Sequence, residues 1–281
     1  MTYLIADSGA TKTDWLYVDE NGTSHIKTQG LHPANIRQAE DFTDVHNQLE
    51  MLEPDNIYFF GAGCGNPVSD EIVRHFLQPM FPKSKITIKS DLDGSGKAFF
   101  GNGDGVVAVL GTGSVSAVIK GGTVLKKSAS LGYAIGDEGS AADLGRRILK
   151  MYFRKSCNDE THRFISSKLN NIEYSEMMTR IYGSFKPNRE LAAIAGKVLI
   201  RPFPDELANM VENALEDFIE NQLKLLSLRG DEEIVFTGKV AEVHKVALLS
   251  LLDKKGFRNS HVYYPVIATF RDRIKSGEKL F

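Results

Sequence analysis

Cysteine and unbalanced charge are both scarce in this sequence. The 281 residues contain two cysteines, Cys64 and Cys157, which are too few and too far apart for a C-x-x-C metal or redox motif. A chain of this length builds hydrophobic cores without disulfides, so a reducing compartment fits best. Lys and Arg number 34 and Asp and Glu 36, a formal net charge of −2. Nucleic acid and anionic membranes attract basic surfaces, so we expect neither as a partner.

Long apolar runs are also missing. No stretch approaches the roughly 18 consecutive apolar residues of a membrane span. The N-terminal residues MTYLIADSGATKTDW lack the basic region and apolar run of a signal peptide, and we therefore expect a cytoplasmic protein. The composition, 42% hydrophobic and 25% charged, is that of an ordinary globular protein. The length predicts about two domains.

Predicted strands and helices alternate along the chain and follow the same plan twice. The first three predicted strands form an antiparallel meander, and three later strands repeat it, with glycine turns around Gly9 and Gly113 at matching positions. Ser69 is the expected N-cap of the second helix. The expected strands are 3–6, 14–18, 25–28, 56–60, 86–88, 106–110, 115–120, 123–126 and 232–236, and the expected helices are 41–52, 69–81, 141–155, 204–227 and 240–254. The repetition predicts an α/β protein of two similar halves.

A glycine turn joins the first two predicted strands, with the sequence D-S-G-A-T-K-T at residues 7–13. Backbone N–H groups and two threonine hydroxyls in such a turn can bind a phosphate, and Gly9 allows close approach to the backbone. Asp7, at the end of a strand, is placed to hold Mg²⁺ directly or through water. Turn residues of a tight hairpin without any ligand would look the same.

A second turn, L-G-T-G-S at residues 110–114, occupies the matching place in the second half. Alone it is typical of any glycine turn between strands. Two such hairpins in a duplicated fold can clamp a polyphosphate between them. Neither matches a P-loop or a G-x-G-x-x-G fingerprint, which disfavours those nucleotide sites.

Three further motifs carry candidate functional residues. In S-D-L-D-G-S (90–95) a carboxylate at a strand end can act as general base for a substrate hydroxyl, although Asp93 followed by glycine also fits a turn or an N-cap. In G-D-E-G-S (136–140) the acidic residues either cap a helix or accept hydrogen bonds from a sugar. In F-T-G-K-V (236–240) the glycine lets an adenine approach the backbone, or simply turns a strand into a helix. Cys64 lacks the partners of a catalytic nucleophile.

Taken in order, these motifs resemble the actin/hexokinase/Hsp70 superfamily of ATP-binding folds, and within it the N-acetylglucosamine kinase branch of the BadF/BadG/BcrA/BcrD ATPase family. The resemblance spans nearly the whole chain. It implies two RNase-H-like α/β domains with a central cleft, at 1–103 plus 263–281 and at 104–262. ATP and Mg²⁺ would bind in that cleft, and the substrate would be a small amino sugar.

The same resemblance implies a role for each matched residue. Asp91 would be the catalytic base, and Asp7 would hold Mg²⁺. Sugar contacts would come from Asn35 and Asp137. The residues implied to bind phosphate, metal or adenosine are Asp7, Gly9, Thr11, Lys12, Gly111, Thr112, Gly113, Ser114 and Gly238.

Departures from the family pattern fall on both sides of the expected site. Ser8 and Ala10 stand where the family usually has glycines, and Val115 replaces the asparagine that usually follows G-T-G-S. Residues 129–133 replace a tryptophan with flanking glycines. Two alternatives therefore stay open beside a sugar kinase: an ATPase that drives electron transfer, although segment 105–145 has no cysteine for an iron–sulfur cluster, and a sensor without catalysis. The sequence leaves dimerisation open.

Overall fold

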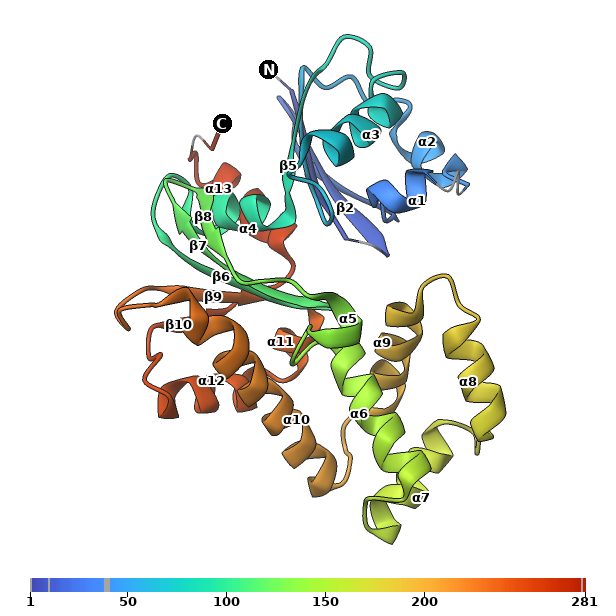
Figure 1. Ribbon diagram of the computed structural model, residues 1–281. Helices are drawn as coiled ribbons and strands as arrows, with labels where there is room; N and C mark the ends of the chain where they lie inside the picture. Colours follow the sequence, from blue (N-terminus) through green and yellow to red (C-terminus); the bar gives the residue numbers. More distant parts are fainter. Residues whose placement is uncertain (1, 10, 38–40, 279) are drawn as a thin grey trace. The chain divides into compact units, whose positions relative to one another are not determined.

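Contacts within the chain define two compact units, seen in a computed structural model that describes residues 2–9, 11–37, 41–278 and 280–281 (Figure 1). The first unit comprises Met1–Asp104, Ile119–Val124 and Tyr264–Phe281, and the second comprises Gly105–Val118 and Leu125–Tyr263. The domain limits expected from the sequence stay a prediction.

A five-stranded sheet forms the centre of the first unit, in the order β3-β2-β1-β4-β5. The first three strands pair antiparallel, as the meander predicted, whereas β1, β4 and β5 are parallel. The carboxyl ends of those parallel strands therefore meet at one edge, where open α/β sheets bind their ligands. The strands are β1 (Tyr3–Ser8), β2 (Lys12–Asp19), β3 (Gly22–Gln29), β4 (Asn56–Gly61) and β5 (Lys85–Ser90).

Both faces of this sheet are covered because both positions of the strand alternation are apolar. Leu4 and Ala6 pack into one core and Ile5 into the other. Phe59 and Phe60 divide in the same way. The helices on the first face are α1 (Pro33–Arg37), α2 (Thr43–Leu49) and α3 (Pro67–Leu77), and those on the second are α4 (Asp91–Phe100) and α13 (Val266–Lys275).

The first turns of α3 and α4 differ from the sequence prediction. The N-cap of α3 is Asn66, not Ser69: its side chain accepts a hydrogen bond of 3.0 Å from the Ser69 amide, and a proline follows at the first helical position, where it lacks no needed N–H. In α4 the N-cap is Ser90, whose hydroxyl accepts from the Asp93 amide at 3.2 Å and donates to the Asp93 carboxylate at 2.6 Å. Gly94 thus lies inside a helix rather than in a turn.

A second five-stranded sheet has the order β10-β9-β6-β7-β8. Reading β6 to β10 for β1 to β5 gives the same order as the first sheet, which confirms the predicted repeat of architecture. Strands β6, β9 and β10 are parallel. The strands are β6 (Gly105–Leu110), β7 (Ser114–Lys120), β8 (Thr123–Lys127), β9 (Ile234–Thr237) and β10 (Ser260–Val262).

Helices of the second unit bury one large core. The single helix predicted over 204–227 is wrong, because α10 ends at Phe218 and continues as a π-helical turn and then a 3₁₀ turn. The helix predicted over 240–254 is interrupted at His244. The elements are α5 (Gly132–Ile135), α6 (Ala141–Arg154), α7 (Asp159–Lys168), α8 (Tyr174–Tyr182), α9 (Pro187–Val198), α10 (Asp205–Phe218), η1 (Ile219–Leu223), η2 (Lys224–Leu226), α11 (Lys239–Val243) and α12 (Lys245–Lys254).

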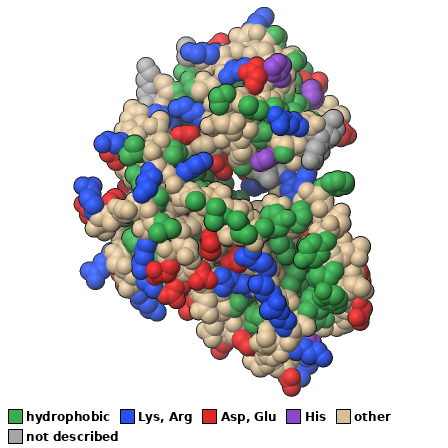
Figure 2. All heavy atoms as spheres, viewed as in Figure 1, with side chains coloured by type: hydrophobic (Ala, Val, Ile, Leu, Met, Phe, Trp, Pro, Cys, Tyr) green, Lys and Arg blue, Asp and Glu red, His purple; other side chains and the backbone are tan. Residues whose placement is uncertain are grey.

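Hydrophobic side chains gather on the surface over α8 and α9, as Figure 2 shows. Tyr182, the last residue of α8, and Phe185, between α8 and α9, are mostly exposed. None of the residues predicted for the functional site belongs to this patch. Within the described part of the chain, no helix is both long and apolar enough to cross a bilayer.

Close packing of α6 against α9 depends on Gly145. A Cβ at Gly145 would lie 1.9 Å from the carbonyl oxygen of Leu191, so any side chain would push the two helices apart. At Gly196, which lies in α9 like Leu191, an added Cβ would meet no atom within 4 Å. The two glycines form a matched pair in one pair of helices.

We expect Gly145→Ala to lower the free energy of unfolding by about 1–3 kcal/mol through overpacking, although alanine favours a helix. Gly196→Ala should raise it by about 0.5–1 kcal/mol, since only the helix propensity changes. Urea unfolding of the two variants measures both. A stabilising effect of Gly145→Ala would show that this contact does not limit the packing.

Candidate functional site

Two aspartates meet at the carboxyl edge of the first sheet. Asp7 lies near the end of β1 and Asp91 begins α4 directly after β5, with β4 between the two strands. Desolvation by burial, the negative charge of Asp91 and then that of Asp14 raise the pKa of Asp7 to about 7. The structure thus brings Asp7, the predicted metal ligand, close to Asp91, the predicted base. The carboxylates gathered there are mutually repulsive.

Lys12 is the predicted phosphate ligand in this turn, and its ammonium group is paired within the protein. It lies 2.7 Å from the Asp14 carboxylate and 5.3 Å from the centre of the Tyr264 ring. Asp14 also contacts Nε2 of His25 at 3.0 Å. About half of the Lys12 side chain is exposed, so one side of the ammonium group faces solvent.

The turn after β1 leaves room at its glycine. The Gly9 amide donates to the Lys12 carbonyl at 2.9 Å, and a Cβ at Gly9 would meet only that same oxygen, at an ordinary 3.6 Å. The packing of the turn therefore does not require glycine, which leaves ligand approach as a reason for it. Thr11 is exposed, and Ala10 lies outside the described residues.

Thr13 does not face a ligand, which corrects the expectation that both threonine hydroxyls do. Its hydroxyl lies 2.8 Å from that of Ser8 and donates to the Gln29 carbonyl at 3.2 Å. Both hydroxyls accept from the amide of Leu31, at 3.1 and 3.2 Å. Sequence reasoning missed this buried pair, which ties the first turn to the segment before α1. Its signal was the hairpin register that sets Ser8 directly opposite Thr13.

Asn35, the predicted sugar ligand of this unit, lies in α1 and is 6% exposed. Its backbone amide donates to the His32 carbonyl at 2.9 Å. The His32 ring packs on Gly63, where a Cβ would come within 2.6 Å of Nε2. Gly63 has φ +80°, and the close ring is a second reason for glycine there. Sequence reasoning missed His32, which joins α1 to the loop after β4.

Cys64 lies in the same loop and is chemically quiet. Desolvation by burial, together with the negative charges of Asp70 and Asp91, raises the pKa of the Cys64 thiol to about 12. The thiol stays protonated near neutral pH and is a poor nucleophile. This agrees with the absence of a nucleophile signature in the sequence.

The second glycine turn joins β6 to β7 and is held by α6. The Gly111 amide donates to the Gly113 carbonyl at 3.0 Å. The amides of Ala141 and Ala142, in the first turn of α6, donate to the carbonyls of Gly111 and Thr112 at 2.9 and 3.2 Å. The helix N-terminus therefore holds the turn rather than a ligand. In the described part of the chain, the amides of Thr112 and Gly113 have no acceptor, so they are free to bind an anion.

Asp137 and Gly238 both lie against this turn. Oδ1 of Asp137 accepts from the Ser114 amide at 3.4 Å, and a Cβ at Gly113 would lie 2.9 Å from Oδ2. Burial is the main reason that the pKa of Asp137 is raised. A Cβ at Gly238, whose φ is +102°, would lie 2.4 Å from the Leu110 carbonyl oxygen. Three sequence motifs thus meet at one place in the second unit.

The Ser114 hydroxyl is committed to the protein interior. It donates to the Glu138 carbonyl at 2.8 Å and accepts from Nε2 of Gln222 at 2.8 Å. Its one proton is therefore unavailable to a phosphate oxygen. Sequence reasoning missed Gln222, whose signal was an amide at an apolar-stripe position of the helix predicted over 204–227.

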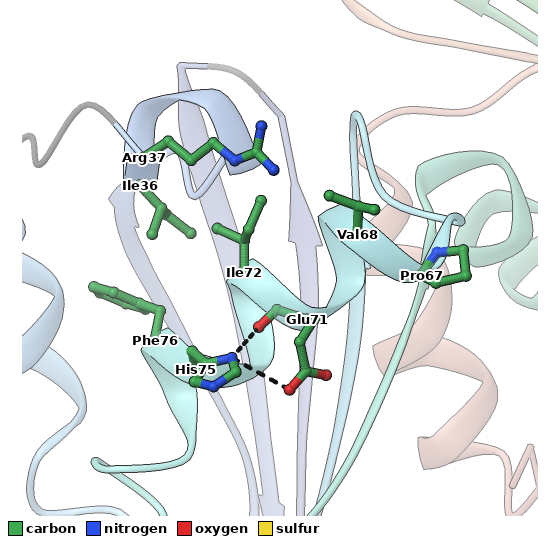
Figure 3. Close-up of a pocket in the computed structure, with 8 residues that line it drawn as sticks. All are labelled: Ile36, Arg37, Pro67, Val68, Glu71, Ile72, His75 and Phe76. Atoms are coloured by element: carbon green, nitrogen blue, oxygen red, sulfur yellow. Dashed lines mark hydrogen bonds and ion pairs between the residues drawn. The ribbon is translucent and has the colours of Figure 1, made fainter.

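A cavity of about 730 Å³ lies elsewhere, between α1 and α3 (Figure 3). Its lining is mainly apolar, with His75 held 3.2 Å from the Glu71 carboxylate. None of the predicted site residues lines it. In residues 2–9, 11–37, 41–278 and 280–281, no group of three or more His, Cys, Asp and Glu side chains is arranged to hold a metal.

Comparisons with known proteins agree with the motifs. The family model of the BadF/BadG/BcrA/BcrD ATPase family matches residues 6–271. Glucosamine kinase GspK of Vibrio cholerae is 24% identical, covering 82% of this chain and 78% of its own. N-acetyl-D-glucosamine kinase of Dictyostelium discoideum is 28% identical, covering 90% of this chain and 89% of its own.

Solved structures confirm the predicted α/β fold. A proposed N-acetylglucosamine kinase from Porphyromonas gingivalis superposes with a TM-score of 0.86 at 25% identity, covering 98% of this chain and 100% of the other. A ROK family glucokinase from Streptomyces griseus, at 15% identity, a TM-score of 0.50 and coverage of 92% and 89%, shares the fold alone. With its motifs in the family order and the family model matching nearly its full length, the chain belongs to the BadF/BadG/BcrA/BcrD ATPase family.

Proposed function

We propose that this protein is a kinase that transfers the γ-phosphoryl group of MgATP to a hydroxyl of an amino sugar, with N-acetylglucosamine as the first candidate. The observation that carries the proposal is the pair of Asp7 and Asp91 at one sheet edge. The two curated relatives, named as kinases of glucosamine and of N-acetylglucosamine, support the choice of acceptor.

Asp91 is the proposed general base. It begins α4, and Oδ1 accepts from the Leu92 amide at 3.0 Å, which fixes the carboxylate at the helix start. A carboxylate held there can accept the proton of a sugar hydroxyl as that oxygen attacks the γ-phosphorus. The carboxyl edge of the sheet supplies the position, and Asn35 in α1 would contact the sugar.

Asp7 is the proposed Mg²⁺ ligand, and its surroundings fit a cation. Burial and then the negative charges of Asp91 and Asp14 raise its pKa, and Lys12 only partly offsets them. Mg²⁺ takes oxygen ligands and keeps several waters, so one or two carboxylates with substrate phosphates complete its shell. When bound, the ion would neutralise charge on the phosphate oxygens.

Backbone amides are the proposed phosphate ligands. The turn with Gly9 and Thr11 would serve one part of the chain of phosphates, and the free amides of Thr112 and Gly113 another. Lys12 would add charge from its exposed side. We propose that Gly238 borders the adenosine. Asp137, the second proposed sugar ligand, also accepts from Ser114, so its carboxylate would link the acceptor to the second turn.

ADP release from MgATP with a panel of sugars tests the function. The panel holds N-acetylglucosamine, glucosamine, N-acetylmuramic acid and glucose, with a control without sugar. Turnover stimulated by one amino sugar supports a kinase and identifies its acceptor. Hydrolysis indifferent to every sugar favours an ATPase, and nucleotide binding without turnover favours a sensor; either result overturns the proposal.

Asp91→Asn should lower kcat by about 10²–10⁴-fold while leaving the Kd for MgATP nearly unchanged, because the amide cannot accept the proton. Asp93→Asn is the matched control in the same helical turn: it weakens the hydrogen bond from the Ser90 hydroxyl to this side chain, so the melting temperature should fall while turnover persists. Coupled ADP release and calorimetric MgATP binding give both values. Full turnover by Asp91→Asn would remove this residue from the mechanism.

Asp7→Asn should change how stability depends on pH in the metal-free protein. The pKa of the Asp7 carboxyl rises from its ordinary value of 3.8 to about 7 in the folded protein. Between these two values the folded state binds the proton more tightly than the unfolded state does, so the free energy of unfolding falls as pH rises. The asparagine variant lacks this loss, so at pH 8 it should be more stable than the parent by on the order of a few kcal/mol. Urea unfolding in EDTA at pH 4 and pH 8 measures the difference. A difference that does not grow with pH would contradict the assignment of the shift to Asp7.

A further inference from the structure

A buried glutamine on a π-helical turn joins three segments of the second unit. Gln222 lies in η1, directly after α10, and is 2% exposed. Its Nε2 donates to Ser114 Oγ at 2.8 Å and to a carboxylate oxygen of Glu138 at 2.9 Å. Its Oε1 accepts from Ser128 Oγ at 3.1 Å. Both ends of the amide are therefore used.

The partners of Gln222 are the supports of the second glycine turn. Ser114 is the first residue of β7, directly after Gly113, and its amide contacts Asp137. Glu138 follows Asp137 in the chain. Its carbonyl accepts from the Ser114 hydroxyl and its carboxylate from Gln222, and these two bonds anchor the backbone beside the aspartate. Ser128, after β8, accepts from the Ser116 amide at 3.0 Å and fixes Oε1.

Gln222 continues the buried stripe of α10 into the π-helical turn. That stripe is apolar up to this point, with Val211, Leu215 and Phe218. In the π-helical turn at Ile219–Leu223 the stripe places the Gln222 amide among buried polar atoms. Such turns are rare and occur often at functional sites. An apolar residue here would leave the amide's partners without their hydrogen bonds.

We infer that Gln222 is a positioning residue for nucleotide binding: it holds Ser114 and Glu138, and through them the amides of Thr112 and Gly113 and the carboxylate of Asp137. It touches no ligand itself. The inference rests on the proposed function, because it assigns those amides to phosphate. Without the Nε2 donor, the Glu138 carboxylate loses its hydrogen bond beside Asp137, and the turn loses the tie that orients Ser114.

The test compares Gln222→Leu, which keeps a similar volume, with Asn221→Leu. Asn221 is an exposed neighbour in η1 whose side chain contacts only the Asp217 carbonyl among the described residues. We expect Gln222→Leu to weaken the binding of MgADP and of a non-hydrolysable MgATP analogue by roughly 10-fold, the cost of an unsatisfied buried group. The KM for ATP should rise in parallel, and the KM for sugar should rise too, because Asp137, the second proposed sugar ligand, loses the same support. Asn221→Leu should change neither.

Ser128→Ala gives a milder variant if Gln222→Leu fails to fold. It removes only the hydroxyl that fixes Oε1, and we expect about a 3-fold loss of MgADP affinity. A cycle of Gln222→Leu and Ser114→Ala should be non-additive, because both changes break the same bond. Additive effects would overturn the inference.

The two levels of the proposal fail in different ways. If the parent protein binds MgADP and Gln222→Leu, or Ser128→Ala in its place, lowers the melting temperature with an unchanged Kd, Gln222 is structural and the inference is overturned while the kinase proposal stands. If the parent binds no adenine nucleotide by calorimetry, the proposed function is overturned and the inference with it. A selective loss of nucleotide affinity supports both.

Discussion

The arrangement of the first unit depends on the parallel pairing of β1, β4 and β5. This pairing brings the ends of three strands to one edge, and with them Asp7 and Asp91. Burial makes a charge on Asp7 costly, Asp91 adds a second negative charge close by, and Lys12 is already shared with Asp14. A fold selected for stability alone would not concentrate negative charge there. In the proposed function, a cation bound together with ATP would relieve that repulsion.

The second unit uses the opposite arrangement around its glycine turn. Hydrogen bonds from the first turn of α6 hold the carbonyls of Gly111 and Thr112, and the Gln222 network satisfies Ser114. What remains is the pair of amides of Thr112 and Gly113, which have no acceptor among the described residues. Backbone amides held rigidly in this way are suited to bind phosphate oxygens, which carry the negative charge themselves. The first unit therefore concentrates negative charge around Asp7, and the second presents uncharged hydrogen-bond donors.

Much of this could be predicted from the sequence because the signals are local. The alternation of Leu4, Ile5 and Ala6 fixes a strand buried on both faces, and the motif order located Asp7, Asp91 and Gly238. The predicted N-cap at Ser69 failed because Asn66 with the following proline is the stronger start. The helix predicted to end at residue 227 failed because apolar periodicity does not distinguish an α-helix from a π turn.

The sequence alone determined the family, the repeated α/β plan and the chemical types in each motif, since all of these depend on neighbouring residues and on their order. Only the tertiary structure decided which motif residues are available. Thr13 and Ser114 have hydroxyls that a phosphate could use, yet both are turned inward by partners far along the chain, Leu31 and Gln222. Each hydroxyl has a single proton, which Thr13 donates to the Gln29 carbonyl and Ser114 to the Glu138 carbonyl, and these acceptors are set by packing between separate segments rather than by the motif.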